Sequence, residues 1–336
     1  MYRGEFKLLT PAQRLERVRA TLETRMASWE ASMYKQYEKQ FEGRYSGRDL
    51  AFVSKMAVSQ RLRPVRAQLR AMTEIKGSTL LAEALRTAPG DMRKTYLENC
   101  EAGLTWWEDA VAEAYMMVRL GFAAPDKSIY HLLVDEAQDY SETALAMLSL
   151  YHPNARVTLL GDPMQRTCPG MGDCHSENWG ACFGDPEAKV FKLSRCYRST
   201  LPIARLCNAI LPDAEQLKPF GREGEMPVVA QYSVEAVQSA LAGMRAAGHR
   251  SIAVITRTQK QAESLSQKLE NVYRFDGGDD DQNYETGDTV VGSYHLMKGL
   301  EFDAVIVAWP DVELTDGERR RLYTACSRAL DRKSVV

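Results

Sequence analysis

The sequence contains no long hydrophobic run. No stretch of its 336 residues approaches the roughly 20 consecutive apolar residues that cross a bilayer, and residues 1–5 do not begin a signal peptide. These absences argue against membrane-spanning and secreted proteins. Since 45% of the residues are hydrophobic, the chain can bury a sizeable core, ordinarily in two or three domains. We therefore expect a cytoplasmic protein without a membrane partner.

Paired cysteines are also absent, because none of the seven cysteines forms a Cys-x-x-Cys motif. One loop nevertheless gathers Cys168, Cys174, His175 and Cys182. Zinc binding by this loop competes with the alternative that these are free thiols of a cytosolic protein. The other cysteines fall in apolar patterns and are expected to be small core residues: Cys100, Cys196, Cys207 and Cys326.

The chain as a whole has little excess charge of either sign, but the charge is unevenly distributed. Residues 1–100 carry 19 Lys and Arg against 11 Asp and Glu, a balance of +8, which leaves −10 for the remainder because the whole chain carries −2. Apolar residues at helical spacing predict helices here, and the last of them carries Arg61, Arg63, Arg66 and Arg70. These arginines could contact nucleic-acid phosphates or an acidic partner, or simply form a solvated helix face.

The most informative segment is the apolar run from Ile129 to Val134, which ends in Asp135 and Glu136. The run predicts a buried parallel strand, and ligands bind at the carboxyl ends of such strands. Asp135 can reach Mg²⁺ and Glu136 can polarise an attacking water, as in nucleotide hydrolases. A strand followed by a charged helix cap is the alternative.

Further motifs follow in order. A second apolar run, Val157 to Leu160, precedes Gln165, which could sense a γ-phosphate, and a third covers Val190 to Leu193. Arg198 opens an amphipathic segment, and its planar guanidinium suits phosphate oxygens. Near the end, residues 290–303 precede a strand at 304–308, and residues 322–330 look helical and carry Arg328, a candidate arginine finger.

The order of these motifs identifies a resemblance. Val-Asp-Glu-Ala-Gln-Asp, Gly-Asp-Pro-Met-Gln, Tyr-Arg-Ser, His-x-x-Lys-Gly-Leu-Glu-Phe-Asp and Tyr-Thr-Ala-Cys-Ser-Arg-Ala resemble the UvrD/Rep-like superfamily 1 DNA helicases over about residues 104–330. The residues around Asp139 and Tyr197 look most like the HelD branch, which binds bacterial RNA polymerase. The resemblance implies P-loop NTPase architecture of the α/β class, with tandem RecA-like motor domains.

The resemblance also implies a role for each motif residue. It assigns Mg²⁺ to Asp135, water activation to Glu136, γ-phosphate coupling to Gln165, and transition-state charge to Arg198 and Arg328. It also places Tyr197 near adenine, Glu301 near the ribose, Gly299 at a close backbone approach and His295 between nucleotide and nucleic acid. Taken singly, Tyr197 could be a core aromatic, His295 a surface histidine and Glu301 half of an ion pair.

One motif of the family is missing. No Gly-x-x-x-x-Gly-Lys-Ser/Thr occurs, and Arg48-Asp49 stands where Lys and Ser/Thr should follow the pair Gly43 and Gly47. On the resemblance, Met1 falls inside a helical insertion of an incomplete first motor domain. We therefore expect a helical arm at 1–125, the second half of RecA-like domain 1 at 126–195 and RecA-like domain 2 at 196–336.

Three function classes follow. The first is an ATP-dependent, Mg²⁺-using DNA helicase or translocase acting on single-stranded DNA, with little or no turnover by this chain alone. The second is a non-hydrolysing remnant that docks on RNA polymerase or DNA. The third is a chain without a stable fold, since removing a central strand exposes apolar edges.

Overall fold

The computed structural model describes residues 9–166, 178–211, 218–278, 289–310 and 313–335. The chain divides into two compact units. Unit 1 comprises Met1–Leu132 and Glu142–Thr158, and unit 2 comprises Leu133–Ser141 and Leu159–Val336. No helix among the described residues is long and apolar enough to cross a membrane.

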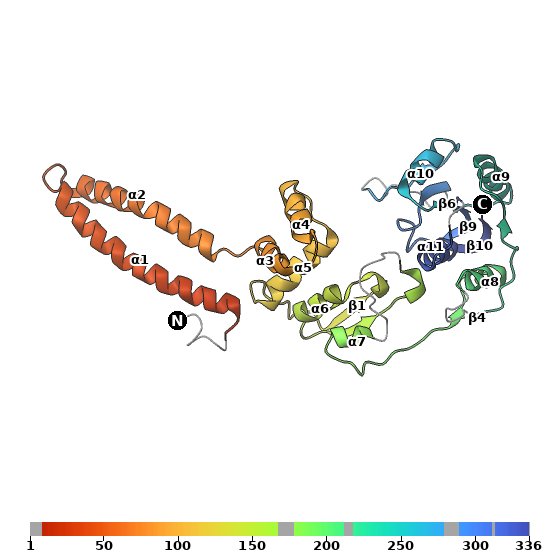
Figure 1. Cartoon of the computed structure of the whole chain (residues 1–336), viewed down its shortest axis with the longest axis horizontal. Helices are drawn as coiled ribbons and strands as arrows, with labels where there is room; N and C mark the ends of the chain where they lie inside the picture. The colour runs from red at the N-terminus through yellow and green to blue at the C-terminus, as the bar shows by residue number, and fades with distance from the viewer. Residues whose placement is uncertain (1–8, 167–177, 212–217, 279–288, 311–312, 336) are drawn as a thin grey trace. The chain divides into compact units, whose positions relative to one another are not determined.

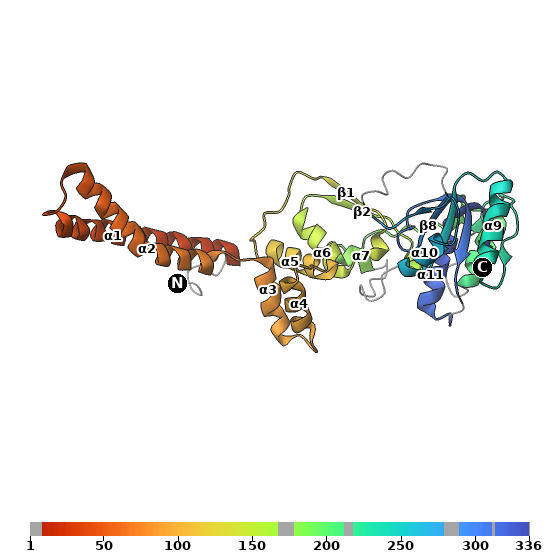
Figure 2. The same cartoon turned by 90° about the horizontal axis from the view of Figure 1, so that it is seen from above.

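Unit 1 begins with a helical hairpin of α1 (Pro11–Phe41) and α2 (Gly47–Thr73), whose helices run side by side (Figures 1 and 2). A capping box starts α1, because Thr10 Oγ1 accepts the Gln13 N–H while Gln13 caps the Thr10 N–H in return. The buried residues of α2 are Ser54, Val58 and Leu62, four residues apart, so only one stripe of this helix is covered. The helices predicted in the basic segment are confirmed.

The rest of unit 1 is a group of shorter helices followed by part of a two-stranded sheet. The helices are α3 (Gly77–Ala84), the 3₁₀ turn η1 (Leu85–Thr87), α4 (Met92–Glu101), α5 (Trp107–Arg119) and α6 (Glu142–Tyr151). β1 (His131–Val134) pairs with β2 (Arg156–Leu159), within two residues of the predicted strands.

Unit 2 is built on a six-stranded sheet in the order β5-β10-β9-β6-β8-β7, and every neighbouring pair of its strands is parallel. Its strands are β5 (Val228–Val229), β6 (Ile252–Thr256), β7 (Tyr273–Arg274), β8 (Thr289–Ser293), β9 (Phe302–Ala308) and β10 (Ala329–Val335). A separate parallel pair joins β3 (Arg195–Cys196) to β4 (Lys218–Pro219).

Helices cover both faces of this sheet, as alternation along its strands requires. Ala253 and Ile255 of β6 point into the cluster that contains residues of α8 (Leu201–Ile210) and α11 (Asp316–Cys326). Ile252 and Val254 point into the opposite cluster, with α9 (Val234–Ala246) and α10 (Gln259–Ser266). The predicted α/β class with a parallel sheet is confirmed, whereas the tandem RecA-like arrangement and the three predicted domain ranges stay predictions.

Four expectations about local structure are wrong. The strand β1 is not buried as expected, since Val134 is its one buried residue and Leu133 is 62% exposed. Cys100, expected in the core, is exposed.

The apolar run Val190 to Leu193 is not a strand: its side chains are mostly exposed, and the strand β3 is only the two residues that follow Ser194. The helix expected over 322–330 ends at Cys326, and Ala329 starts β10. Apolar periodicity alone does not distinguish a short buried strand from a helix end, and pairing with β9 decides it here.

Candidate functional site

Two adjacent carboxylates follow β1 in unit 2. Asp135 is exposed, and its Oδ1 accepts the backbone N–H of Glu136 at 2.8 Å. Glu136 has φ 52°, a left-handed conformation that only Glu136 and Asn271 adopt among the described non-glycine residues. Because a residue with a Cβ is strained by about 1–2 kcal/mol there, its surroundings must hold it in place. The 3₁₀ turn η2 (Ala137–Asp139) follows at once.

A series of hydrogen bonds connects this turn to residues of unit 2 that lie far along the sequence. Gln138, which is 2% exposed, donates from Nε2 to Glu136 Oε2 at 2.6 Å and accepts the Asp162 N–H at 3.1 Å. Gln165 donates from Nε2 to Asp162 Oδ2 at 2.9 Å and accepts a hydrogen bond from Arg328 Nη2. Glu136, Gln165 and Arg328, three residues expected to share a site, are therefore linked through Gln138 and Asp162.

Gly161 leaves the space that these hydrogen bonds need. A Cβ at this position would lie 2.4 Å from Gln138 Oε1 and 3.0 Å from the Trp179 ring. Any larger residue would displace the Gln138 amide, which accepts the backbone N–H of the next residue, Asp162. Asp162 also caps the 3₁₀ turn η3 (Pro163–Gln165) by accepting the Met164 N–H.

Lys298 supplies a cation to the carboxylates. It lies in the turn after β8, its side chain is 9% exposed, and its Nζ is 3.1 Å from Glu136 Oε2. The same Nζ forms a shorter ion pair with Asp139 Oδ2. One ammonium group thus serves two carboxylates, and one of them is the predicted water-activating residue.

Arg328 is the largest fully buried side chain among the described residues, at 2% exposed. Its Nε donates to Thr324 O at 3.2 Å, and its Nη2 donates to Ser327 Oγ at 3.1 Å as well as to Gln165. Burial lowers the pKa of Arg328 to about 10, and the positive charge of Arg198 lowers it further, while nearby carboxylates oppose the shift. Arg328 stays protonated at neutral pH and is held firmly by its partners.

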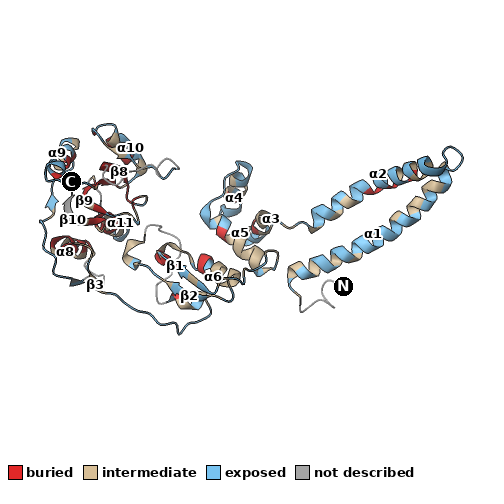
Figure 3. Ribbon diagram, turned by 180° about the vertical axis from the view of Figure 1, so that it is seen from behind, coloured by how far each residue is buried: buried red, intermediate tan, exposed pale blue. Residues whose placement is uncertain are grey.

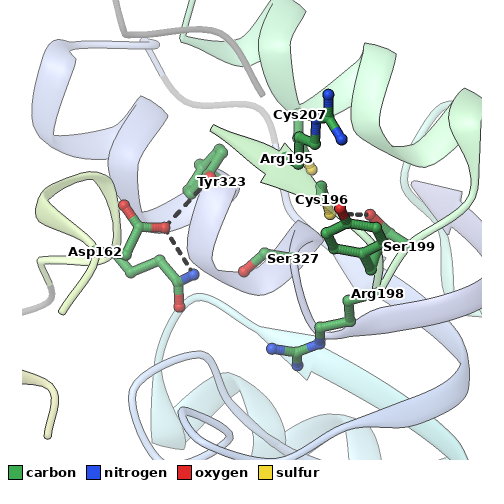
Figure 4. A pocket seen from close by; sticks show the side chains of 10 residues that line it. Asp162, Arg195, Cys196, Arg198, Ser199, Cys207, Tyr323 and Ser327 are labelled. Atoms are coloured by element: carbon green, nitrogen blue, oxygen red, sulfur yellow. Dashed lines mark hydrogen bonds between the residues drawn. The ribbon is translucent and has the colours of Figure 1, made fainter. Parts of the chain in front are cut away.

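A pocket of about 290 Å³ lies in unit 2 beside these hydrogen-bonded residues (Figure 4). Residues of three motifs that are far apart in sequence line it. They are Asp162, Gln165, Arg195, Cys196, Tyr197, Arg198, Ser199, Cys207, Tyr323 and Ser327. On one wall, Tyr323 donates from its hydroxyl to Asp162 Oδ2 at 3.4 Å, and burial, followed by the charge of Asp162, raises the pKa of Tyr323.

Arg198 has hydrogen-bonding capacity that the protein leaves unused. Its Nε lies 3.1 Å from Glu301 Oε1, a separation typical of an ion pair, but the N–H is not directed at the carboxylate. Nε and Nη2 are both buried and make no hydrogen bond to any described residue. Because a buried guanidinium N–H without an acceptor is costly, this group is ready to accept an anionic ligand.

The residues around Arg198 differ in exposure. Tyr197 is 60% exposed and packs on Phe220, with ring centroids 4.8 Å apart, so it is a surface aromatic and not a core one. Cys196 lies with its Sγ 3.3 Å from Ser199 Oγ. Burial opposes ionisation of this thiol, but hydrogen bonds from Ser199 and the charge of Arg198 outweigh it and lower the pKa of Cys196. Cys196, expected to be a small core residue, is thus only half-buried and lines the pocket.

The remaining motif residues lie in or beside the turn between β8 and β9. His295 and Glu301 are exposed, and only Glu301 has an ion-pair distance to a residue of the pocket, Arg198. Gly299 has φ 83°, and a Cβ there would meet no atom within 4 Å. Within the described residues, its glycine is required by backbone conformation, not by crowding.

The four arginines of the basic segment lie on α2 in unit 1. Arg61, Arg63 and Arg70 are exposed, while Arg66 is half-buried and donates to Glu30 Oε2 at 2.7 Å. With 3.6 residues per turn, Arg63, Arg66 and Arg70 share one side of the helix, and Arg61 points elsewhere. Arg66 and Arg70 also line a shallow pocket of about 220 Å³ with Arg19 of α1.

The described residues fit an anionic ligand better than they fit a metal ion. The Arg198 guanidinium, whose buried Nη2 has no hydrogen-bond partner among the described residues, fits an anionic ligand such as a nucleotide phosphate. As arranged here, the carboxylates do not fit Mg²⁺, since Lys298 already holds Glu136 and Asp139 and the described residues contain no group of three or more metal-ligating side chains. Mg²⁺ binding by Asp135 stays a prediction. Three residues of the zinc hypothesis, Cys168, Cys174 and His175, lie outside the described residues.

The last part of the sequence, which contributes residues to this site, matches a known protein family. Residues 288–336 match the UvrD-like helicase C-terminal domain. This UvrD-like segment contains β8, β9, α11 and β10 and carries Lys298, Glu301 and Arg328. The helicase resemblance seen in the sequence is confirmed at this level.

Solved structures give further likenesses. The C-terminal domain of a possible DNA helicase from Lactobacillus plantarum WCFS1 is 31% identical, with 42% of this chain and 86% of that domain covered and a TM-score of 0.35. The arterivirus nonstructural protein 10 helicase in complex with DNA is 19% identical, with coverages of 63% and 40% and a TM-score of 0.37. PRRSV helicase is 19% identical, with coverages of 61% and 34% and a TM-score of 0.36. The chain thus spans well under half of these viral helicases. No curated protein matched the sequence.

Sequence reasoning assigned no role to four residues that hold the site together. They are Gln138, Asp162, Lys298 and Tyr323. All four stand inside motifs that were quoted for other residues, so their positions were visible but their partners were not. Their contacts join residues more than 100 positions apart or depend on burial, and neither is encoded in local spacing.

Proposed function

We propose that this chain carries the nucleotide-responsive part of a superfamily 1 helicase or translocase of the UvrD/Rep/HelD type. In this proposal the pocket beside Arg198 takes the phosphates of ATP, and Tyr197 and Glu301 meet the adenine and ribose. The observation that carries the proposal is the Arg198 guanidinium in the pocket wall, whose buried Nε and Nη2 make no hydrogen bond to a described residue. Two tandem RecA-like domains, coupled by Gln165 and Arg328, are the architecture that would use such a site.

The chemistry available to these residues is charge stabilisation and water activation. Arg198 and Arg328 would balance charge that develops on a transferred phosphoryl group. Glu136 would accept a proton from water through Oε1, because Oε2 already accepts from Gln138 and pairs with Lys298. Without a Gly-x-x-x-x-Gly-Lys-Ser/Thr loop in this sequence, we expect nucleotide binding with little or no turnover.

Binding of a fluorescent ATP analogue to the full chain tests the proposal. Arg198→Gln should weaken binding roughly tenfold or more, since a charged hydrogen bond contributes about 1.5–3 kcal/mol. Arg205→Gln, an exposed arginine on α8, is the matched control and should leave binding unchanged. Equal binding by the chain and the Arg198 variant would overturn the nucleotide assignment.

Turnover is measured separately, with and without single-stranded DNA. Glu136→Gln is the control. ATP hydrolysis that disappears in this variant would mean that a phosphate cradle exists in the chain, and our expectation of poor turnover would be wrong. Hydrolysis that persists in Glu136→Gln would come from a contaminating enzyme.

A second candidate function is a non-catalytic module that binds DNA or RNA polymerase. The exposure of Arg61, Arg63 and Arg70 on α2 favours it. For DNA, each arginine replaced by Gln should reduce the slope of log affinity against log salt by about 1. If DNA affinity changed neither with salt nor with these substitutions, α2 would not be the binding surface.

A further inference from the structure

The groove between the two hairpin helices is a charged feature that the nucleotide proposal does not use. This hairpin groove measures about 220 Å³, and its lining includes Arg19 of α1 and Arg66 and Arg70 of α2. The half-buried side chains of Met26 and Leu69 form its apolar part. All the buried residues of α2 precede the groove in sequence, so the groove lies beyond the covered part of this helix.

Positive charge in the hairpin groove exceeds what nearby carboxylates balance. The lining contains three arginines and one glutamate, Glu23, which pairs with Arg19 at 2.9 Å. Glu30 pairs with Arg66 at 2.7 Å. Arg70 is exposed, and its side chain makes no hydrogen bond or ion pair to a described residue. Three guanidinium groups thus face two carboxylates, and one positive charge is left over.

This arrangement is unfavourable for the hairpin by itself. Arg66 and Arg70 are four residues apart on α2, and like charges at this spacing repel each other. The side chains of the two ion pairs remain 38–53% exposed, so water and salt weaken both pairs. An external anion that contacts all three arginines would relieve the repulsion and could displace the weakly held carboxylates.

The chemistry and size of the hairpin groove indicate a phosphate group of a larger ligand. A guanidinium offers two parallel N–H donors that match two phosphate oxygens. Pockets that enclose a small molecule usually measure about 300–1,000 Å³, so this groove suits one group of a ligand that continues outside it. Arg63 lies on the same side of α2, and the row from Arg63 to Arg70 extends about 10 Å along the helix. A phosphodiester chain fits such a row.

An exposed aromatic ring accompanies the arginines. Trp29 of α1 is 59% exposed and lies three residues after Met26, so the two side chains are neighbours on the helix. Bases of single-stranded nucleic acids stack on such rings while cationic side chains hold the backbone. An acidic protein segment would use the arginines but not the ring. The combination therefore favours nucleic acid.

We propose that the hairpin groove binds a backbone phosphate of single-stranded nucleic acid between α1 and α2, through Arg19, Arg66 and Arg70. The phosphate oxygens replace the carboxylates that pair with Arg19 and Arg66. The inference rests on the second candidate function, DNA binding through α2, and deepens it by adding a residue of α1 and a defined phosphate position. The whole site lies within unit 1.

Fluorescence anisotropy of a labelled single-stranded oligothymidylate with the full chain tests the inference. Arg19→Gln should weaken binding about threefold to tenfold and reduce the slope of log affinity against log salt by about 1. Glu23→Gln removes a carboxylate that competes with the phosphate, so it should strengthen binding. Arg25→Gln, an exposed arginine on another side of α1, is the matched control and should leave affinity unchanged.

The two variants of the Arg19–Glu23 pair also exclude a structural explanation. Both break the same ion pair, so a loss of hairpin structure would shift DNA affinity in the same direction in both. The proposal requires opposite shifts, with helix content unchanged by circular dichroism. Weakening of binding to the same extent in both variants would overturn the inference.

A chemical footprint locates the bound strand. Modification of arginines by phenylglyoxal, followed by peptide mass spectrometry, should be slowed by oligothymidylate at Arg19, Arg66 and Arg70 but not at Arg25. Inorganic phosphate at the same total phosphate concentration should protect none of them. Equal protection by inorganic phosphate would mean a site for free anions and would overturn the nucleic-acid assignment.

Failure of this inference is distinguishable from failure of the proposed function. If Arg63→Gln weakens DNA binding while Arg19→Gln and Glu23→Gln leave it unchanged, α2 binds DNA without the groove and only the inference is wrong. If oligothymidylate does not bind the chain at all, DNA binding through α2 is wrong as well. The nucleotide assignment is tested separately, by the ATP analogue and Arg198→Gln.

Discussion

The helical hairpin of unit 1 and the parallel sheet of unit 2 differ in how many of their side chains they bury. No residue of α1 is buried, whereas all five residues of β6 and all five of β8 are (Figure 3). A helix in a two-helix hairpin can cover only one stripe, but a strand inside a sheet with helices on both faces is covered on both sides.

The buried side chains of unit 2 stabilise its fold, whereas the exposed side chains of the hairpin are available for contacts. The buried side chains of unit 2 hold the turns that carry Glu136, Gln165 and Arg328 in one arrangement. The hairpin leaves large side chains such as Trp29 and Phe52 exposed, so its surface can change with little effect on folding. Substitutions in the two regions should therefore differ sharply in cost.

The largest effect is expected from Phe302→Ala in β9. Phe302 is 1% exposed in the core cluster of unit 2, and truncating a buried phenylalanine costs about 3–5 kcal/mol. Trp29→Ala on α1 removes a larger side chain that is 59% exposed, and should change stability by no more than about 0.5 kcal/mol. Chemical denaturation combined with hydrogen exchange of the β9 peptide measures both.

Hydrogen exchange is needed because a chain of two units need not unfold in one step. A Trp29→Ala protein that loses as much protection in β9 as Phe302→Ala would contradict the comparison. It would mean that the hairpin, despite its exposure, supports the sheet.

The same contrast explains how much could be predicted from the sequence. Short apolar runs predicted β1, β2 and β9 within two residues of their true positions, although β9 is largely buried and β1 and β2 are only partly so. The run at Val190 to Leu193 has the same composition but no neighbouring strand, and it is exposed. Composition reports that a segment can be buried, while only tertiary pairing decides whether it is.

For the candidate site, the sequence predicted individual residues but not the contacts between them. Asp135, Glu136, Gln165, Arg198 and Arg328 were named from motif order. That Gln138 and Asp162 link them, or that Lys298 neutralises Glu136, depends on distances between residues up to 163 positions apart. A buried lysine leaves no periodic signal, because its burial is a property of its partners.

An intermediate effect is expected at an ion pair in the sheet region. Glu318 has an 8% exposed side chain, accepts from Arg257 Nε at 3.0 Å and Nη2 at 2.9 Å, and pairs with Arg321. Glu318→Gln should destabilise unit 2 by about 2 kcal/mol at pH 7, since it removes charge-assisted hydrogen bonds. Denaturation at several pH values measures the loss.

The pH dependence follows from the direction of the shift. The hydrogen bond from Arg257 lowers the pKa of Glu318, against the effect of burial, and the charges of Arg321 and Arg257 lower it further. A depressed pKa stabilises the folded state above the ordinary glutamate value of about 4.3, and the contribution disappears as pH falls from there through the folded pKa. The gap between the unmodified chain and Glu318→Gln should therefore be full at pH 7 and narrow below about pH 4. A gap that widens in acid would contradict the assignment.

The smallest effect is expected at the ion pair that joins the two hairpin helices. Glu30 accepts from Arg66 at 2.7 Å, but the two side chains remain 46% and 38% exposed, so water and salt screen the pair. Glu30→Gln should change stability by no more than about 0.5 kcal/mol, and the difference should shrink at high salt. It should at the same time free Arg66 to contact an anion, so single-stranded DNA binding should strengthen if α2 is the nucleic-acid surface. Hydrogen exchange of the α1 and α2 peptides, measured beside DNA affinity, separates the two effects. A large loss of protection in both helices would show that the hairpin depends on this pair, and the contrast with the sheet would then be one of degree.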